Sequence, residues 1–248
     1  MPKQQTRYYF VDFIRGFAVV NMVIFHFLYD VFVVYGKEPQ WYNLPGVQIW
    51  QQSICWAFIF ISGFVWTLGA ERNIQRGLLF NLYGLIISFV TLLVSPAYVI
   101  WFGILNFIGC AILFMFLIEK KVKTVSPVWG FGICFILFLL CKRIQHGFVG
   151  IGGLFQIKLP EILYSTKILT PFGFPFMGFQ SSDYFPILPW IFLFLCGYFF
   201  FQIFTQHETW RNFACFKIPF LSMLGSNTIW IYLAHQPLSM LICFIIFQ

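Results

Sequence analysis

A series of long apolar stretches constrains this chain more than any other feature. An α-helix crosses a bilayer with about 20 consecutive apolar residues, and about seven stretches approach or exceed that length. They cover residues 10–34, 48–70, 77–95, 98–118, 125–141, 185–205 and 218–246. Only 9% of the residues are charged and 60% are hydrophobic, whereas a soluble domain has about 25% charged residues. The sequence therefore predicts an all-α, polytopic membrane bundle of about seven spans.

The basic residues indicate an orientation in the membrane. The net charge is +7, but the charges lie in short clusters between apolar stretches, which favours lipid over nucleic acid as the partner. Lys and Arg in short loops mark the cytoplasmic side. The clusters that would share this side are Lys3 with Arg7, Arg72 with Arg76, Lys120, Lys121 and Lys123, and Arg211 with Lys217. We therefore predict a cytoplasmic N-terminus in a multi-pass protein of the cell's inner membrane.

Residues 142–185 form the longest segment without a clear span. The segment is rich in Gly and Pro, and loops of this length are usually functional or serve as lids. We predict a long outer loop, or a re-entrant segment, within a single transmembrane domain that covers residues 1–248.

The cysteines do not indicate a metal site. Most of the 7 cysteines lie inside apolar stretches, and their spacing matches neither a disulfide framework nor a zinc site. We interpret them as small apolar core residues and predict no metal.

The first apolar stretch carries ionisable residues on one helical face. Asp12 and Arg15 are three positions apart, whereas Met22, His26 and Asp30 follow one another at four-residue spacing, so all five share a face. An ionisable group in a span normally faces the bundle interior or a water-filled cavity. His26 lies eleven residues beyond Arg15, which is about 16 Å along a helix. The face therefore runs from a cation near the cytoplasm to a His–carboxylate pair in the outer half.

The pair of His26 and Asp30 is chemically suggestive. A carboxylate near an imidazole can fix one tautomer and raise its basicity, and the other nitrogen can then act as a general base. Two other interpretations remain open. His26 can be a structural residue bonded to a neighbouring helix, or the pair can be the proton pathway of a proton-coupled transporter or permease.

Further polar residues interrupt the apolar text in the middle or outer half of the predicted membrane. They are Asn106, Asp183, Asn227, His235 and Gln236. Each has a structural alternative: an amide in a span bonds neighbouring helices, and an acid at the start of a helix is stabilised by its dipole. Pro237 is expected to kink the last span.

Five motifs in order resemble a known family. They are "RYYFVDFIRGFAVVNMVIFHFLYD", "FIFISGF", "FGILNFIG", "DYFPILPW" and "GSNTIWIYLAHQP". Together they resemble bacterial proteins similar to the catalytic domain of heparan-α-glucosaminide N-acetyltransferase, over essentially the whole chain. The chain is more distantly similar to the membrane O-acyltransferases of acyltransferase family 3, which share Arg-Gly and then His on their first helix.

The resemblance implies transfer of an acyl group across the membrane. Acetyl-CoA would bind from the cytoplasm without a metal, and an envelope sugar or glycolipid would offer an amine or hydroxyl on the outer side. Arg15, oriented by Asp12, would bind the CoA phosphates, because Arg suits phosphate by charge and geometry. Arg72 and Arg76 would assist from a cytoplasmic loop.

The acceptor side follows from the same resemblance. His26, supported by Asp30, would deprotonate the acceptor or transiently carry the acyl group. The residues expected to hold the acceptor or the tetrahedral oxygen are Asn106, Asp183, Asn227, His235 and Gln236. The lysosomal relative also suggests a homodimer.

The chain departs from the family pattern in three places. Bacterial relatives commonly have His where this chain has Asn106, so a non-catalytic member is an alternative. The catalytic histidine of the lysosomal enzyme comes slightly later, beyond an Asn that aligns with His26. The large lumenal insertion of that enzyme is missing, which makes heparan sulfate an unexpected substrate for this chain.

The transporter interpretation of the His26–Asp30 pair is disfavoured because the two halves of the sequence show no internal repeat, which many transporters have.

Overall fold

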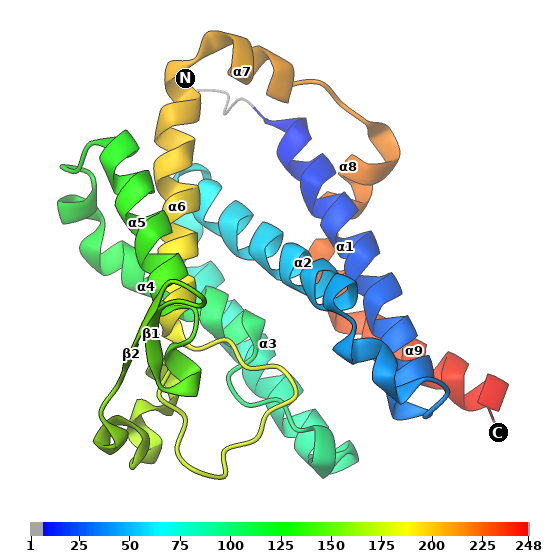
Figure 1. Ribbon diagram of the computed structural model, residues 1–248. Coiled ribbons are helices and arrows are strands. Elements are labelled where there is room, and N and C mark those ends of the chain that lie inside the picture. Colours follow the sequence, from blue (N-terminus) through cyan, green and yellow to red (C-terminus); the bar gives the residue numbers. More distant parts are fainter. Residues whose placement is uncertain (1–6, 248) are drawn as a thin grey trace. The chain divides into compact units, whose positions relative to one another are not determined.

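A computed structural model describes residues 7–247, and most of these residues are helical (Figure 1). Lys3, one of the charges behind the predicted orientation, lies outside the described residues. Contacts divide the chain into two compact units. The first joins Met1–Ile61 with Phe204–Gln248, and the second is Ser62–Ile203. The prediction of a single domain over residues 1–248 stays a prediction.

The first unit combines the two ends of the chain. From the N-terminal end it contains helix α1 (Tyr9–Tyr29), the π-helical turn η1 (Asp30–Val34), the 3-10 turn η2 (Pro39–Asn43) and most of α2 (Pro45–Phe64). From the C-terminal end it contains α7 (Glu208–Ala214), α8 (Pro219–Ser226) and α9 (Thr228–Phe247).

The second unit is the middle of the chain. Its helices are α3 (Asn73–Val94), α4 (Ile104–Val122), α5 (Pro127–Cys141) and α6 (Ile187–Gln206), of which α6 ends in the first unit. Its 3-10 turns are η3 (Thr67–Arg72), η4 (Pro96–Tyr98), η5 (Ile144–His146), η6 (Glu161–Tyr164) and η7 (Lys167–Phe172). Its strands are β1 (Phe148–Ile151) and β2 (Phe155–Lys158).

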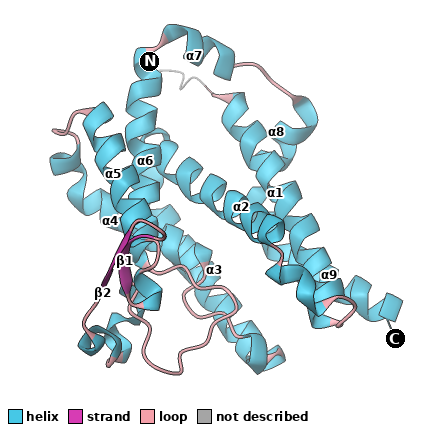
Figure 2. Cartoon of the chain, in the orientation of Figure 1, coloured by secondary structure: helices cyan, strands magenta, loops and turns pink. Residues whose placement is uncertain are grey.

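Residues 142–185 contain a β-hairpin and short 3-10 turns, with no α-helix (Figure 2), and the outer loop or re-entrant segment expected here stays a prediction. The strands are antiparallel, with Phe148 opposite Lys158 and Ile151 opposite Phe155. Gly153 in the connection has a φ of +91°, a conformation that Gly adopts without steric cost. This hairpin adds two short strands to a chain that is otherwise mostly helical, and two glycines between short β-prone runs are a sequence signal for it.

Close backbone approach joins α1 to α8. A Cβ placed at Gly16 would overlap the carbonyl of Leu221, and one placed at Gly225 would overlap the carbonyl of Asp12. Small residues allow helices in membranes to approach this closely. The glycines therefore place α8 directly against the N-terminal half of α1.

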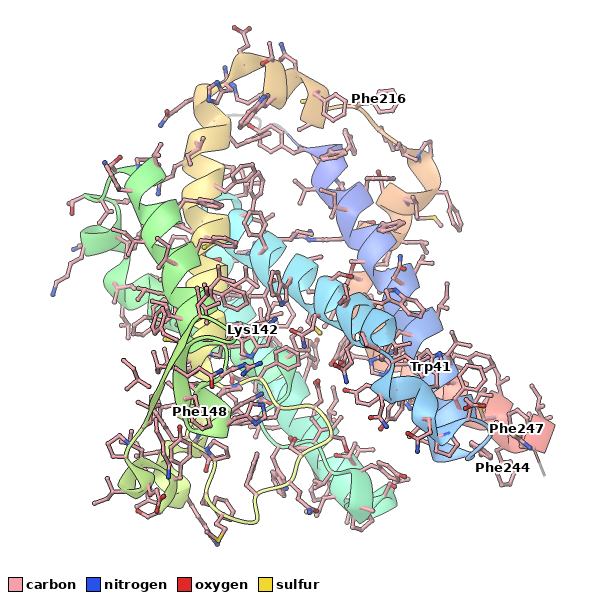
Figure 3. All side chains as sticks on the ribbon, viewed as in Figure 1. Trp41, Lys142, Phe148, Phe216, Phe244 and Phe247 are labelled. Atoms are coloured by element: carbon pink, nitrogen blue, oxygen red, sulfur yellow. The ribbon has the colours of Figure 1, made fainter. Side chains whose placement is uncertain are left out.

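Helices α1 and α9 run in the same direction. His26 lies beside His235, and Tyr35, just beyond the π-helical turn, lies beside Phe247 near the end of α9. Figure 3 shows Phe247 and Trp41 at this same end of the first unit. A buried cluster of Val19, Met22, Phe25 and Ile54 fills the space between α1 and α2. Met22 is 4% exposed, so the polar face predicted for α1 does point inward at this position.

Five helical segments of the described chain are long and apolar enough to span a membrane. They are Tyr9–Val34, Thr67–Val94, Pro127–His146, Ile187–Gln206 and Thr228–Phe247. Their length and composition support a helical membrane protein. Helices α2 and α4 coincide with two further predicted spans, but α2 carries several glutamines and α4 carries Glu119, Lys120 and Lys121 near its C-terminal end. The count of seven and the cytoplasmic N-terminus stay predictions.

The last predicted span, 218–246, is two helices. Helix α8 ends at Ser226, and Asn227 interrupts the chain with φ −107° and ψ 15° before α9 begins. The Asn227 side chain donates to the Met223 carbonyl, so it satisfies a carbonyl that the helix end leaves without an intrahelical partner. Pro237 lies inside α9. The predicted span is therefore interrupted at Asn227, before α9 begins, and α9 continues through Pro237.

Candidate functional site

His26 of α1 and His235 of α9 lie side by side in the first unit. Their ring centroids are 4.9 Å apart. One turn further along both helices, Asp30 of α1 lies beside Ser239 of α9. Because the helices are parallel, residues at four-residue spacing on one helix meet residues at the same spacing on the other. The result is a polar cluster of His26, Asp30, His235, Gln236 and Ser239, which we call the two-histidine cluster.

The Asp30 carboxylate is held by α9. Asp30 is 1% exposed. Gln236 Nε2 donates to its two oxygens at 2.9 Å and 3.1 Å, and Ser239 Oγ donates to Oδ2. A buried carboxylate needs such donors because its desolvation is costly. Asp30 also begins the π-helical turn, a type of turn that is frequent at functional sites.

The sequence analysis expects the Asp30 carboxylate to support His26, and a hydrogen bond between the two side chains would provide that support directly. Among residues 7–247, no hydrogen bond joins a ring nitrogen of His26 to the Asp30 carboxylate, which accepts instead from Gln236 and Ser239. Sequence reasoning did not single out Ser239, because one serine in a span is ordinary. Its spacing of four residues after His235 was the available signal.

His235 has one nitrogen with a partner and one without. Its Nδ1 lies within hydrogen-bond distance of the Tyr232 carbonyl. Its Nε2 is buried and has no hydrogen-bond partner among the described residues. The whole residue is only 9% exposed. Unsatisfied buried polar atoms are rare and call for an explanation.

The other end of the polar face of α1 is an ion-pair group. Asp12 is 7% exposed, and its carboxylate lies 2.9 Å from Arg7 Nη2 and 3.5 Å from Arg15 Nη1. The structure thus places Asp12 beside Arg15, as the spacing suggested, and adds Arg7 as a second cationic neighbour. One carboxylate between two guanidinium groups leaves a net positive charge at this end of α1.

Arg72 and Arg76 lie at the start of α3 in the second unit. Arg76 Nη1 donates to Asn73 Oδ1 at 3.2 Å, and Asn73 Nδ2 donates to the Trp66 carbonyl at 3.0 Å. Within the described chain, no carboxylate lies within ion-pair distance of Arg76. A helix N-terminus with cations and no acid in its first turn favours an anionic ligand.

Asn106 and Asp183 also belong to the second unit. Asn106 Nδ2 lies 3.4 Å from the Asn81 carbonyl of α3, and its side chain packs against Gly84. Asp183 Oδ2 accepts the Ile104 N–H at 3.3 Å and so caps the start of α4. Burial raises the pKa of Asp183 to about 6, against the opposing effect of the Ile104 hydrogen bond. Both side chains therefore have structural partners.

The structure groups the predicted residues by unit. His26, Asp30, His235 and Gln236 come together in the first unit, whereas Asn106 and Asp183 lie in the second. Asn227 is in the first unit, eight residues before His235, or about 12 Å along a helix. Among residues 7–247 no group of three or more His, Cys, Asp or Glu side chains is placed to hold a metal ion.

The described chain is therefore a helical membrane protein with a cluster of two histidines and a carboxylate between parallel helices, in which Asp30 and His235 are buried and His26 is half-buried. A family model described as "Heparan-alpha-glucosaminide N-acetyltransferase, catalytic" matches residues 7–237. The chain belongs to this family, which confirms the resemblance seen in the sequence motifs. No curated protein and no solved structure matches the chain. The family indicates a membrane acetyltransferase-like protein.

Proposed function

We propose that this protein is a membrane acyltransferase that moves an acetyl group from cytoplasmic acetyl-CoA to an amine or hydroxyl on the outer side of the membrane. The observation that carries the proposal is the two-histidine cluster between α1 and α9 in a chain of an acetyltransferase family. Acyl transfer needs a group that accepts the acceptor's proton, and imidazole is the side chain most often used for this.

The donor is proposed to bind through the basic residues. The positive end of α1 at Arg15 and the start of α3 at Arg76 each offer guanidinium groups suited to CoA phosphates. Along α1, about 16 Å separates Arg15 from His26, a length that suits an extended pantetheine arm. His26 then meets the thioester, either as a base or as a transient carrier of the acyl group.

The acceptor is proposed to be an envelope sugar or a glycolipid. The residues of the first unit proposed to hold it are Gln236, Asn227 and His235. The structural partners of Asn106 and Asp183 make positioning through α3 and α4 the simpler role for those two. We propose the inner membrane as the location, on the distribution of basic loops, and a homodimer as the assembly.

Binding of CoA tests the donor side. A ligand that binds only the native protein at 100 times its Kd stabilises it by about 2.7 kcal/mol, so added CoA should raise the Tm of the protein in detergent. Arg15→Gln and Arg76→Gln should reduce this rise, each measured against its own ligand-free Tm. Arg211→Gln is the control, because Arg211 is an exposed cation of α7 outside the proposed site.

Three results would contradict the proposal. The absence of any Tm rise with CoA in the wild-type protein would remove the donor. Binding of CoA without release of thiol from acetyl-CoA would indicate a non-catalytic member of the family. Proton flux in liposomes that depends on His26, without thiol release, would favour the transporter.

A further inference from the structure

The unpartnered nitrogen of His235 has no structural explanation. A histidine that served only to join helices would use both ring nitrogens, because an unsatisfied buried polar group costs about 1–3 kcal/mol. Here Nδ1 is satisfied by the Tyr232 carbonyl, while Nε2 is buried without a partner among the described residues. The arrangement costs stability, and such costs are typical of sites that wait for a substrate.

The Tyr232 contact fixes which nitrogen carries the proton. A carbonyl oxygen only accepts hydrogen bonds, so Nδ1 of His235 must be the donor. In the neutral imidazole the other nitrogen then has a lone pair and no hydrogen. Nε2 of His235 is therefore a base whose tautomer and ring orientation are set by the backbone of α9, one turn earlier.

His26 lacks an equivalent anchor. The carboxylate one turn away, Asp30, accepts from Gln236 and Ser239 of α9. In the described part of the chain, no hydrogen bond fixes a tautomer of His26, whose ring lies against that of His235 at 4.9 Å between centroids. Of the two histidines, His235 is thus the one already oriented to accept a proton.

We propose that His235 is the general base of the acyl transfer, and that its Nε2 removes the proton of the acceptor amine or hydroxyl. This inference rests on the proposed function and moves the proton-accepting role from His26 to His235. His26 keeps contact with the thioester. The clamp of Asp30 by Gln236 and Ser239 positions α9, and with it the His235 ring, against α1.

The acceptor nitrogen or oxygen forms a bond to the thioester carbonyl carbon while its proton moves to Nε2 of His235. The C–S bond breaks, and the electron pair leaves with the CoA thiolate. The imidazolium of His235 then returns the proton to the thiolate. The products are the acylated acceptor, free CoA thiol and neutral His235.

His235→Asn is the decisive variant. The Asn amide can still donate to the Tyr232 carbonyl, but it has no basic nitrogen, so it separates the structural role from the chemical one. The assay measures CoA thiol released from acetyl-CoA with glucosamine as a simple acceptor. General bases contribute about 10²–10⁴-fold to rate, so thiol release should fall at least about 100-fold while the CoA-induced rise in Tm is retained. His207→Asn is the matched control, because His207 precedes α7 and should leave the rate unchanged.

Two further measurements keep the proposal open to refutation if His235→Asn folds poorly. His235→Ala should regain part of its activity with added imidazole, which can occupy the vacated space. In the wild-type protein labelled with ¹⁵N-histidine, NMR should show one histidine with a protonated Nδ1 and a bare Nε2.

The outcomes separate the inference from the proposed function. A wild-type rate in His235→Asn, or a proton on Nε2 of the resting histidine, would overturn the assignment while leaving the acyltransferase intact. Wild-type protein that neither binds CoA nor releases thiol would overturn the proposed function itself, and the inference with it.

Discussion

The substitution Ser239→Ala removes one of the three hydrogen bonds that hold the buried Asp30 carboxylate. Gln236 still donates to both carboxylate oxygens, so Asp30 is not left without donors. A hydrogen bond to a charged group contributes about 1.5–3 kcal/mol. We therefore expect Ser239→Ala to lower the free energy of unfolding by about that amount. For a chain of this size, this corresponds to a fall in Tm of about 3–12 °C.

The matched control is Ser88→Ala in α3. Ser88 is buried to a similar degree, with 6% exposure against 5% for Ser239. Its hydroxyl donates to the Gly84 carbonyl of its own helix, a carbonyl that the helical N–H of Ser88 already satisfies. Removing that hydroxyl leaves no charge unsatisfied, so the cost should be about 1 kcal/mol or less.

The assay is unfolding in detergent, followed by tryptophan fluorescence during heating or titration with SDS. Adding Asp30→Asn to each background gives a double-mutant cycle. Asp30→Asn should cost less in the Ser239→Ala protein than in the wild type, and the Ser88→Ala background should show no such coupling. If Ser239→Ala costs no more than Ser88→Ala, or if the cycle shows no coupling, the Asp30 clamp does not stabilise the α1–α9 pair.

Two further predictions concern the packing of α8 against α1 and the ionisation of Asp183. Gly225→Ala should destabilise the protein by about 1–3 kcal/mol through overpacking, because its Cβ would overlap the backbone of Asp12. Gly132→Ala in α5, where a Cβ would meet open space, should be neutral or stabilising, and equal Tm values for the two variants would contradict this reasoning. For Asp183, burial raises the pKa of the carboxyl from 3.8 in the unfolded chain to about 6 in the folded protein. The folded state therefore favours the protonated carboxyl. The resulting stabilisation is fully present below about pH 4 and is lost as the pH rises through about 6. Asp183→Asn cannot ionise, so the Tm of the wild type relative to this variant should fall between pH 4 and pH 6 and then level off; a constant difference would show that Asp183 ionises equally in both states.

The sequence predicted the helical segments well because their signal is local. Apolar runs and their Pro and Gly boundaries led to helices at or near the predicted ranges, and five segments meet the requirements for a span. The hairpin at Phe148–Lys158 was missed because its strands are only four residues long. The break at Asn227 was missed because the predicted span 218–246 ran through the short polar stretch at residues 225–228, which is a turn signal.

The candidate site was predicted as a set of residues but not as a set of contacts. The four-residue spacing of His26 and Asp30 predicted that they share one face of α1, and the structure directs both side chains toward α9. It could not show that Asp30 is bonded by Gln236 and Ser239, since those residues are more than 200 positions away. The same holds for Asn106, whose neighbour is the Asn81 carbonyl of α3.

The sequence by itself therefore determined the class of protein, its family and the residues that are too polar for a lipid-facing position. These properties follow from composition, helical periodicity and short motifs, all of which are local. Only the tertiary structure decided which polar groups satisfy one another. Outside water each buried donor or acceptor must find its partner within the protein, and that partner is set by which helices pack together. The pairing of α1 with α9 gave Asp30 its donors and left Nε2 of His235 without one among residues 7–247.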